Sequence, residues 1–160
     1  VALSAVGGGA AHADPAQDML SNPETSILKT GGHILLARHQ GQIVGTCALI
    51  RAGRSRVELS KMAVTSRMQG QGVGRRLLLA AIAQFKRMNA QTLFLESSSR
   101  LTPALTLYES VGFRHAPRPR SASHYVRSDV YMVYEPDAAG KPASTPRRRA
   151  GRRGVVRKRG

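Results

Sequence analysis

The sequence predicts a single α/β (α+β) domain in which helices cover a central sheet. Short apolar runs of strand length alternate with two stretches whose apolar residues recur at helical spacing. Clusters of glycine, proline and polar residues separate these runs, as turns do. A length of 160 residues suits one hydrophobic core. Strands that alternate with helices indicate a sheet with helices packed on it.

The first half of the chain is expected to supply one helix and three strands. Gly31 and Gly32 turn the chain out of the helix, and Gln40-Gly41-Gln42 forms the turn of a hairpin. In order, the expected elements are a short helix at 14–29 and strands at 33–39, 43–50 and 57–64.

The second half is expected to supply two helices and three strands. Leu78, Ile82 and Phe85 fall at helical spacing, which predicts a face buried in the core rather than a ligand site. Pro103 and Gly112 suit the start and the end of a second helix. In order, the expected elements are a helix at 73–88, a strand at 92–96, a helix from 102 or 103 to 111, and a hairpin that starts at 113 and returns at 126–134.

Positive charge is concentrated at the C-terminus. The formal net charge is +16, and residues 141–160 hold nine of the 25 basic residues and no acidic residue. We therefore divide the sequence into a low-complexity segment at 1–13, a domain at 14–136 and a disordered basic tail at 137–160. The tail is either simply solvated or attracts nucleic acid weakly through its phosphates. No aromatic residue lies among the charges of 141–160, so base stacking is not expected.

The composition favours a cytoplasmic protein without a metal. Cys47 is the one cysteine, and we expect it to be a small core residue rather than a nucleophile. No apolar stretch approaches the length of a membrane span, and residues 1–13 lack the basic start of a signal peptide. His115 and His124 have no companion at metal-ligand spacing, which indicates surface histidines. The oligomeric state stays open, with a homodimer as one option.

A glycine-rich loop is the main functional signal. Glycines at 70, 72 and 74 stand directly before a helix, where backbone N–H groups converge and the helix dipole favours an anion. The loop fits neither a P-loop nor a dinucleotide fingerprint. It fits Q/R-x-x-G-x-G from Gln69 to Gly74 and, in a second register, from Arg67 to Gly72. The loop predicts a phosphate site, with a plain connecting loop as the alternative.

Two motifs together resemble the GNAT superfamily of N-acetyltransferases. The first is the strand at 58–64, Glu-Leu-Ser-Lys-Met-Ala-Val, followed by the glycine loop and a helix. The second is A-x-x-L-Y-x-x-x-G-F from Ala104 to Phe113. The interval between them leaves room for one helix and one strand, as the family requires. The resemblance covers about 32–134. It implies a mixed, mostly antiparallel sheet, acetyl-CoA as co-substrate and acetyl transfer to an amine.

The resemblance also implies that the coenzyme is held mainly by the main chain. Met62 and Val64 would pair with the pantetheine amides like an added strand, and a nearby N–H would polarise the thioester carbonyl. The loop amides would hold the pyrophosphate, with Arg75 or Arg76 adding positive charge. The implied cofactor-binding residues are Met62, Ala63, Val64, Gln69, Gly70, Gln71, Gly72, Val73, Gly74 and Arg75.

Three residues are candidates for proton transfer. Glu96 is the first candidate base, because its spacing of twelve residues from Tyr108 resembles that of the ribosomal-protein N-terminal acetyltransferases. Glu58 is the second, because other relatives place a base acting through water at that point. Either carboxylate has a structural role as its alternative. By the same resemblance Tyr108 protonates the departing thiolate, with core packing as its alternative.

Acceptor recognition is expected around the last hairpin. Tyr125, Arg127 and Asp129 are candidate substrate contacts, and Arg127 suits a carboxylate on the acceptor. An ion pair between Arg127 and Asp129 is the alternative. Leu101 departs from the family, which often has an asparagine there in contact with the coenzyme. One of the serines at 97–99 could take its place.

The N-terminus also departs from the family pattern. The family opens with a strand and usually two helices before the first hairpin, and only about thirty residues precede that hairpin here. We therefore expect the first strand and part of the helical cover to be missing or degraded. The expected function is acetyl-CoA-dependent N-acetylation of a small-molecule or peptide amine by direct attack in a ternary complex. A coenzyme-binding pseudoenzyme and a nucleic-acid-associated protein acting through the basic tail are the alternatives.

Overall fold

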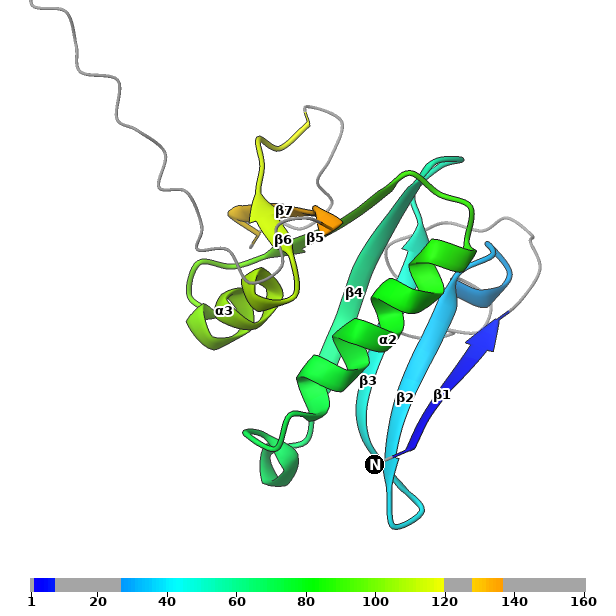
Figure 1. The fold of residues 1–160 in the computed structure, drawn as a ribbon, viewed down its shortest axis with the longest axis vertical. Coiled ribbons are helices and arrows are strands. Elements are labelled where there is room, and N and C mark those ends of the chain that lie inside the picture. Colours follow the sequence, from blue (N-terminus) through cyan, green and yellow to red (C-terminus); the bar gives the residue numbers. More distant parts are fainter. Residues whose placement is uncertain (1, 8–26, 120–127, 137–160) are drawn as a thin grey trace, which may run out of the picture.

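A computed structural model describes residues 2–7, 27–119 and 128–136. Seven strands form one sheet in the order β1-β2-β3-β4-β5-β7-β6 (Figure 1). Neighbouring strands are antiparallel except β4 and β5, which are parallel. The elements are β1 (Ala2–Gly7), β2 (His33–His39), β3 (Gln42–Arg51), β4 (Arg56–Val64), the 3-10 helix η2 (Ser66–Met68), α2 (Val73–Arg87), β5 (Thr92–Ser97), α3 (Thr102–Ser110), β6 (Phe113–His115) and β7 (Val130–Tyr134).

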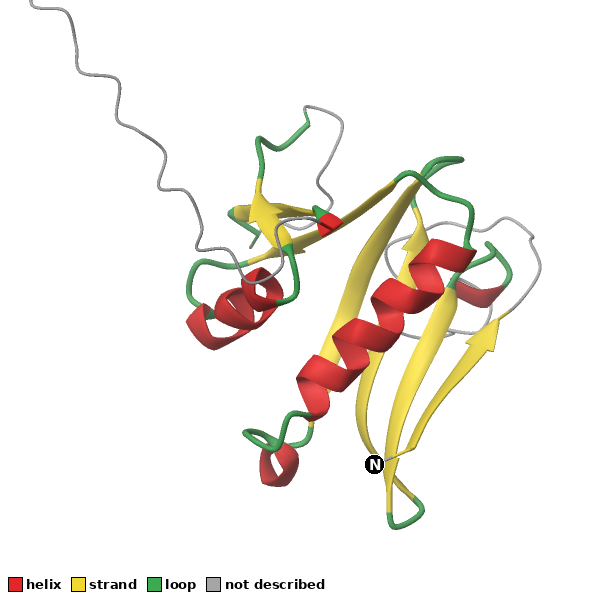
Figure 2. Ribbon diagram, in the orientation of Figure 1, coloured by secondary structure: helices red, strands yellow, loops and turns green. Residues whose placement is uncertain are grey.

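The β2–β3 hairpin follows directly from its two turn residues. Gln40 and Gly41 both have positive φ, at 49° and 77°. A two-residue turn with positive φ at both positions matches the twist of the strands it joins. The predicted hairpin is therefore confirmed, and its turn lies at the end of the molecule near η2 (Figure 2).

Helix α2 lies along one face of the β2–β4 part of the sheet (Figure 1). The residues predicted to face the core from this helix are buried, including Leu78, Ile82 and Phe85. The helix ends at Arg87, and Asn89 follows with a φ of +50°, a conformation that asparagine tolerates better than most residues. Helix α3 packs beside β6, and both helices enclose one core with the sheet.

The predicted sheet of mixed, mostly antiparallel strands is confirmed, and one detail is wrong. The first strand is present, because Ala2–Gly7 forms β1 and pairs antiparallel with β2 from Ala2↔Arg38 to Gly7↔His33. This alanine- and glycine-rich segment lacks the alternation of apolar and polar residues by which a strand is predicted. The strand is recognised only from its main-chain pairing with β2. The sheet thus begins inside the segment that we separated at 1–13.

Some predictions concern residues outside the described part of the chain. The predicted helix at 14–29 is described only from 27 onward, and the tail at 137–160 is not described. The return strand of the last hairpin begins at Val130 rather than at 126, and positions 126 and 127 are not described. In the described ranges, no helix has the length and apolarity to cross a membrane.

Candidate functional site

Strands β4 and β5 pair over only three positions and then separate. The parallel register runs from Arg56↔Thr92 to Glu58↔Phe94. Beyond this point β5 continues alongside β7, and β4 continues alongside β3 (Figure 1). The β5 side of β4 therefore has no described strand as partner from residue 59 onward. An extended ligand can add to such an edge through main-chain hydrogen bonds.

The backbone of Met62 and Val64 is directed toward this unpaired edge. The N–H of Thr65 donates to the carbonyl of Val44 on β3 over 2.9 Å. Backbone groups of successive strand residues alternate between the two sides, so those of Val64 point away from β3. In agreement, the Gln69 side chain donates to the Val64 carbonyl over 3.2 Å. The same alternation directs Met62 outward, which suits the pairing predicted for these two residues.

A β-bulge interrupts β4 next to these residues. The register with β3 shifts between Thr46 and Ala48, so Lys61 and Met62 of β4 stand opposite Cys47 alone. Lys61 has a φ of +52°. A bulge bends its strand and redirects a backbone group out of the ladder. Sequence reasoning missed the bulge, although the apolar residues of this strand carry its signal.

That signal is an interval of three residues within an alternating pattern. Val57 and Leu59 face the core, and strict alternation would place the next apolar side chain at 61. It stands at Met62 instead. A Cβ built on Gly74 of α2 would lie 3.5 Å from Met62 Cε and 3.9 Å from Val64 Cγ2. The bulge thus keeps all four apolar side chains on the face covered by α2.

The glycine loop has the geometry of an anion site. Gly70 and Gly72 both have a φ of +74°, and a Cβ on either would meet no atom within 4 Å. The positive φ therefore favours glycine at both positions, and the space around them is open. The first intrahelical bond runs from the Arg76 N–H to the Gly72 carbonyl, so the N–H groups of 73–75 have no partner within α2.

The charges around this loop also favour a bound anion. The first turn of α2 contains no acidic residue but carries Arg75 and Arg76. Two cations at the positive end of a helix repel its dipole, and a bound anion removes that repulsion. Arg75 donates to the Ser110 hydroxyl of α3 over 3.0 Å. The residues present therefore fit a phosphorylated ligand.

Gly74 brings α2 and α3 together at this end of the site. A Cβ at Gly74 would lie 3.1 Å from Leu107 Cδ2, closer than side chains normally pack. Its glycine therefore permits the first turn of α2 to approach α3. The first turn of α2 therefore lies between α3 and the part of β4 that has separated from β5.

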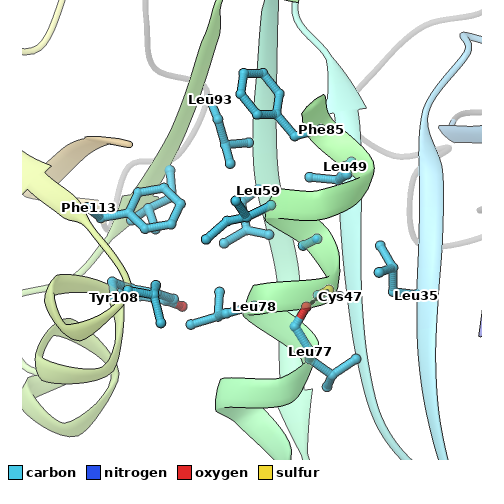
Figure 3. Close-up of a cluster of buried hydrophobic side chains, with 14 of the residues drawn as sticks. Leu35, Cys47, Leu49, Leu59, Leu77, Leu78, Phe85, Leu93, Tyr108 and Phe113 are labelled. Atoms are coloured by element: carbon cyan, nitrogen blue, oxygen red, sulfur yellow. Dashed lines mark hydrogen bonds between the residues drawn. The ribbon is translucent and has the colours of Figure 1, made fainter. Parts of the chain in front are cut away.

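Tyr108 lies on α3 within the main core cluster. Its ring meets the buried Phe113 edge-on, with centroids 6.0 Å apart. Figure 3 shows the Tyr108 hydroxyl oxygen directed from α3 toward the side of α2. Burial raises the pKa of Tyr108, and the nearby Cys47 adds to this effect. The phenol is therefore protonated at neutral pH and can donate a proton.

Glu96 lies on the part of β5 that has separated from β4. Its side chain is on the face of the sheet opposite to the core that contains Tyr108. Leu95 belongs to the core that Tyr108 shares, and successive strand residues alternate between faces. The Glu96 side chain is only 6% exposed. Its Oε2 lies 3.4 Å from Arg118 Nη2 but has no hydrogen-bond partner among the described residues. Sequence reasoning missed Arg118, because nothing local marks a residue between two strands as a partner of Glu96.

Glu58 occupies the last position at which β4 pairs with β5, across from Phe94. It is half-buried and lies on the same face as Glu96, because Val57 and Leu59 on either side of it face the core. Both candidate bases thus lie on one face of the sheet, and the candidate acid lies on the other. The site of strand separation lies between them. This arrangement permits attack on a bound acyl group from one face and departure of the leaving group on the other.

Asp129 connects the residues before β7 to those after β5. The Ser99 N–H donates to Asp129 Oδ1 over 2.8 Å, and the Ser99 hydroxyl donates to Oδ2 over 2.5 Å. The hydrogen bond from the Ser99 side chain, with that from its backbone, lowers the pKa of Asp129. Tyr125 and Arg127, with the ion pair considered for Arg127, lie outside the described residues. A substrate contact by Asp129 stays a prediction.

Other residues near the site have simpler roles. Leu101 precedes α3, is 54% exposed and offers no side-chain cap to the helix. His115 is exposed and lies 3.2 Å from Glu109, as expected of a surface histidine, and His124 is not described. Within the described ranges no group of three or more His, Cys, Asp or Glu side chains could hold a metal ion.

Cys47 is a core residue, as predicted. It is fully buried, and burial raises the pKa of its thiol to about 12. Because only the thiolate reacts, we expect iodoacetamide at pH 8 to modify the folded protein on the order of 10³-fold more slowly than the protein in denaturant. Mass spectrometry of timed samples measures both rates. Equal rates would show that Cys47 is accessible in the folded state.

Known proteins similar to this chain are acetyltransferases, which agrees with the geometry of the site. The sequence family described as an acetyltransferase (GNAT) domain matches residues 30–115. The chain is 29% identical to the uncharacterized N-acetyltransferase YjgM of Escherichia coli over 127 residues, which cover 77% of this chain and 74% of that protein. It is 33% identical to the N-alpha-acetyltransferase RimI of Mycobacterium tuberculosis over 104 residues, which cover 63% of this chain and 64% of that protein.

The fold is also similar to solved structures. An acetyltransferase of the GNAT family from Staphylococcus aureus Mu50 superposes with a TM-score of 0.68 and 29% sequence identity. The superposition covers 74% of this chain and 76% of that structure.

Proposed function

Because this chain belongs to the GNAT superfamily of acetyltransferases, we propose that it moves an acetyl group from acetyl-CoA to a primary amine of a small molecule or a peptide. Attack is direct, within a ternary complex of protein, donor and acceptor. The observation that supports this most is the separation of β4 from β5, with Tyr108 on one face of the sheet and Glu96 on the other.

The donor is held by the main chain in this proposal. The N–H groups at the start of α2 and the glycine loop bind the pyrophosphate, with cofactor-binding residues from Gln69 to Arg75. The edge of β4 formed by Met62, Ala63 and Val64 lies along the pantetheine arm. The bulge at Lys61 provides a backbone N–H for the thioester oxygen, where negative charge develops during attack.

The proton steps balance as follows. Glu96 accepts one proton from the ammonium form of the acceptor, which otherwise dominates at neutral pH because alkyl amines have a pKa near 10. The C–N bond forms and the C–S bond breaks. Tyr108 passes its proton to the sulfur, and the second proton on nitrogen restores the phenol. The products are an amide, the free thiol and one proton released from Glu96 to solvent.

The proposal is tested first by coenzyme binding. At acetyl-CoA concentrations near 100 Kd we expect the free energy of unfolding to rise by about 2.7 kcal/mol, seen as a higher Tm. Gly72→Val should weaken binding measured by calorimetry, because a β-branched residue is strained at a φ of +74°. Gly53→Val is the matched control, since Gly53 has a φ of +94° in open space away from the loop.

A failed binding test has a definite meaning. If folded protein shows neither a Tm shift nor binding heat at millimolar acetyl-CoA, the assigned donor is wrong. If it binds the donor but a broad amine panel, assayed by release of free thiol, gives no turnover, the protein is a coenzyme-binding pseudoenzyme.

A further inference from the structure

Arg118 makes a set of contacts that the proposed reaction does not yet use. Its Nη2 lies 3.4 Å from Glu96 Oε2 and donates to Ser128 twice, to the carbonyl over 2.8 Å and to the hydroxyl over 2.7 Å. Arg118 follows β6, and Ser128 precedes β7. One guanidinium group therefore joins the two ends of the β6–β7 connection to the carboxylate of β5.

The state of Glu96 makes this contact informative. Its side chain is more than nine-tenths buried, and a buried carboxylate without a partner is costly. Arg118 supplies the balancing charge. Yet Oε2 has no hydrogen-bond partner in the described part of the chain, so its capacity to accept a hydrogen bond is unused. A carboxylate serving only as a structural element is normally satisfied by hydrogen bonds.

Resting on the proposed function, we infer that Arg118 is a positioning residue for Glu96. Its charge balances that of the carboxylate inside the protein. Oε2, which Arg118 approaches but which has no hydrogen-bond partner among the described residues, is the atom that would accept the proton of the acceptor amine. Ser128 fixes the guanidinium, so the ends of the β6–β7 connection and the base are held in one arrangement. Arg118 touches neither the acetyl group nor the amine; it acts through Glu96.

The alternative is an ion pair that only stabilises the fold. The two roles differ in how substitutions combine, because residues that act as a unit have non-additive effects on catalysis. If Arg118 acts through Glu96, its removal has no further effect once Glu96 can no longer accept a proton. If the pair is structural, each substitution lowers stability while the chemical step of the folded fraction is unchanged.

The experiment is a double-mutant cycle on the full chain with an acceptor found in the amine panel. Arg118→Met, Glu96→Gln and the double variant are compared in kcat, acetyl-CoA Kd and Tm. We expect Arg118→Met to lower kcat about 10- to 100-fold with the Kd unchanged, and the double variant to equal Glu96→Gln. Arg118→Lys, which keeps the charge, should recover most of the loss. Arg100→Met, at an exposed arginine between β5 and α3, is the matched control and should keep wild-type kcat.

Other outcomes overturn the inference. Wild-type kcat in Arg118→Met, or independent losses that multiply in the double variant, would remove Arg118 from the mechanism while the proposed function stands. If Arg118→Met does not fold, Arg118→Lys decides, since a fall as large as that of Glu96→Gln would contradict a role for the charge. Wild-type protein that turns over no amine would overturn the proposed function and this inference together.

Discussion

Replacing Tyr108 by phenylalanine is expected to lower kcat by about 10²–10⁴-fold, the range over which a positioned acid or base contributes to catalysis. The substitution removes one oxygen and keeps the ring, so the packing against Phe113 is preserved. The hydroxyl makes no hydrogen bond to another described residue, so no internal bond is lost with it. Coenzyme Kd and Tm should therefore stay close to those of the wild type.

The measurement is kcat at saturating donor and acceptor, together with calorimetric Kd. Tyr134→Phe is the control, because this half-buried tyrosine contacts the same Phe113 ring at 5.6 Å and lies on β7. It should keep wild-type kcat. Because the pKa of Tyr108 is raised by burial, donation by the phenol should persist through the neutral range and be lost only as the pH rises above about 10. Full activity of Tyr108→Phe would leave the tyrosine a packing residue.

The second large effect is expected at Glu96. Glu96→Gln keeps the size of the side chain but cannot accept a proton, and kcat should fall by about 10²–10⁴-fold. Glu58→Gln tests the other candidate on the same face of the sheet, and we expect it to lower kcat by less than about tenfold. Both variants are assayed at several pH values with the same acceptor.

A pH series also separates a lost base from a lost contact. An external amine acceptor that is already deprotonated at high pH needs no base. The difference between wild type and Glu96→Gln should therefore shrink as the pH approaches the pKa of the acceptor. A large deficit in Glu58→Gln with a mild one in Glu96→Gln would exchange their roles.

Much of the fold could be predicted because its elements are locally encoded. The glycines at 70 and 72 require a positive φ, and the apolar spacing of α2 specifies its buried face. Strand boundaries in the hairpin agree with prediction within a residue or so, since two turn residues determine them. The motif around Tyr108 predicted a helix that ends at a glycine, and α3 and Gly112 provide it.

The missed features depend on contacts that are distant in sequence. Strand β1 lacks an apolar pattern and is recognised only by its pairing with β2. Arg118 meets Glu96 because β5, β6 and β7 lie side by side, which no local pattern states. The interval of three residues between Leu59 and Met62 indicates the bulge at Lys61. This can be inferred only if Leu59 and Met62 are known to lie on the same face of the sheet. The catalytic and coenzyme roles of the site residues stay predictions.

The short pairing between β4 and β5 separates the sheet into two parts. One part, built from β1 to β4 and α2, would bind the phosphates mainly through main-chain atoms in the proposed function. The other part, built from β5 to β7 and α3, carries Tyr108 and Glu96, the proposed proton donor and acceptor, and the β6–β7 connection beside Glu96. In the proposed function, substitutions in the second part would therefore change which amine is accepted, while the first part continues to bind the coenzyme. Proteins built in this way could thus evolve toward new acceptors while keeping one mode of coenzyme binding.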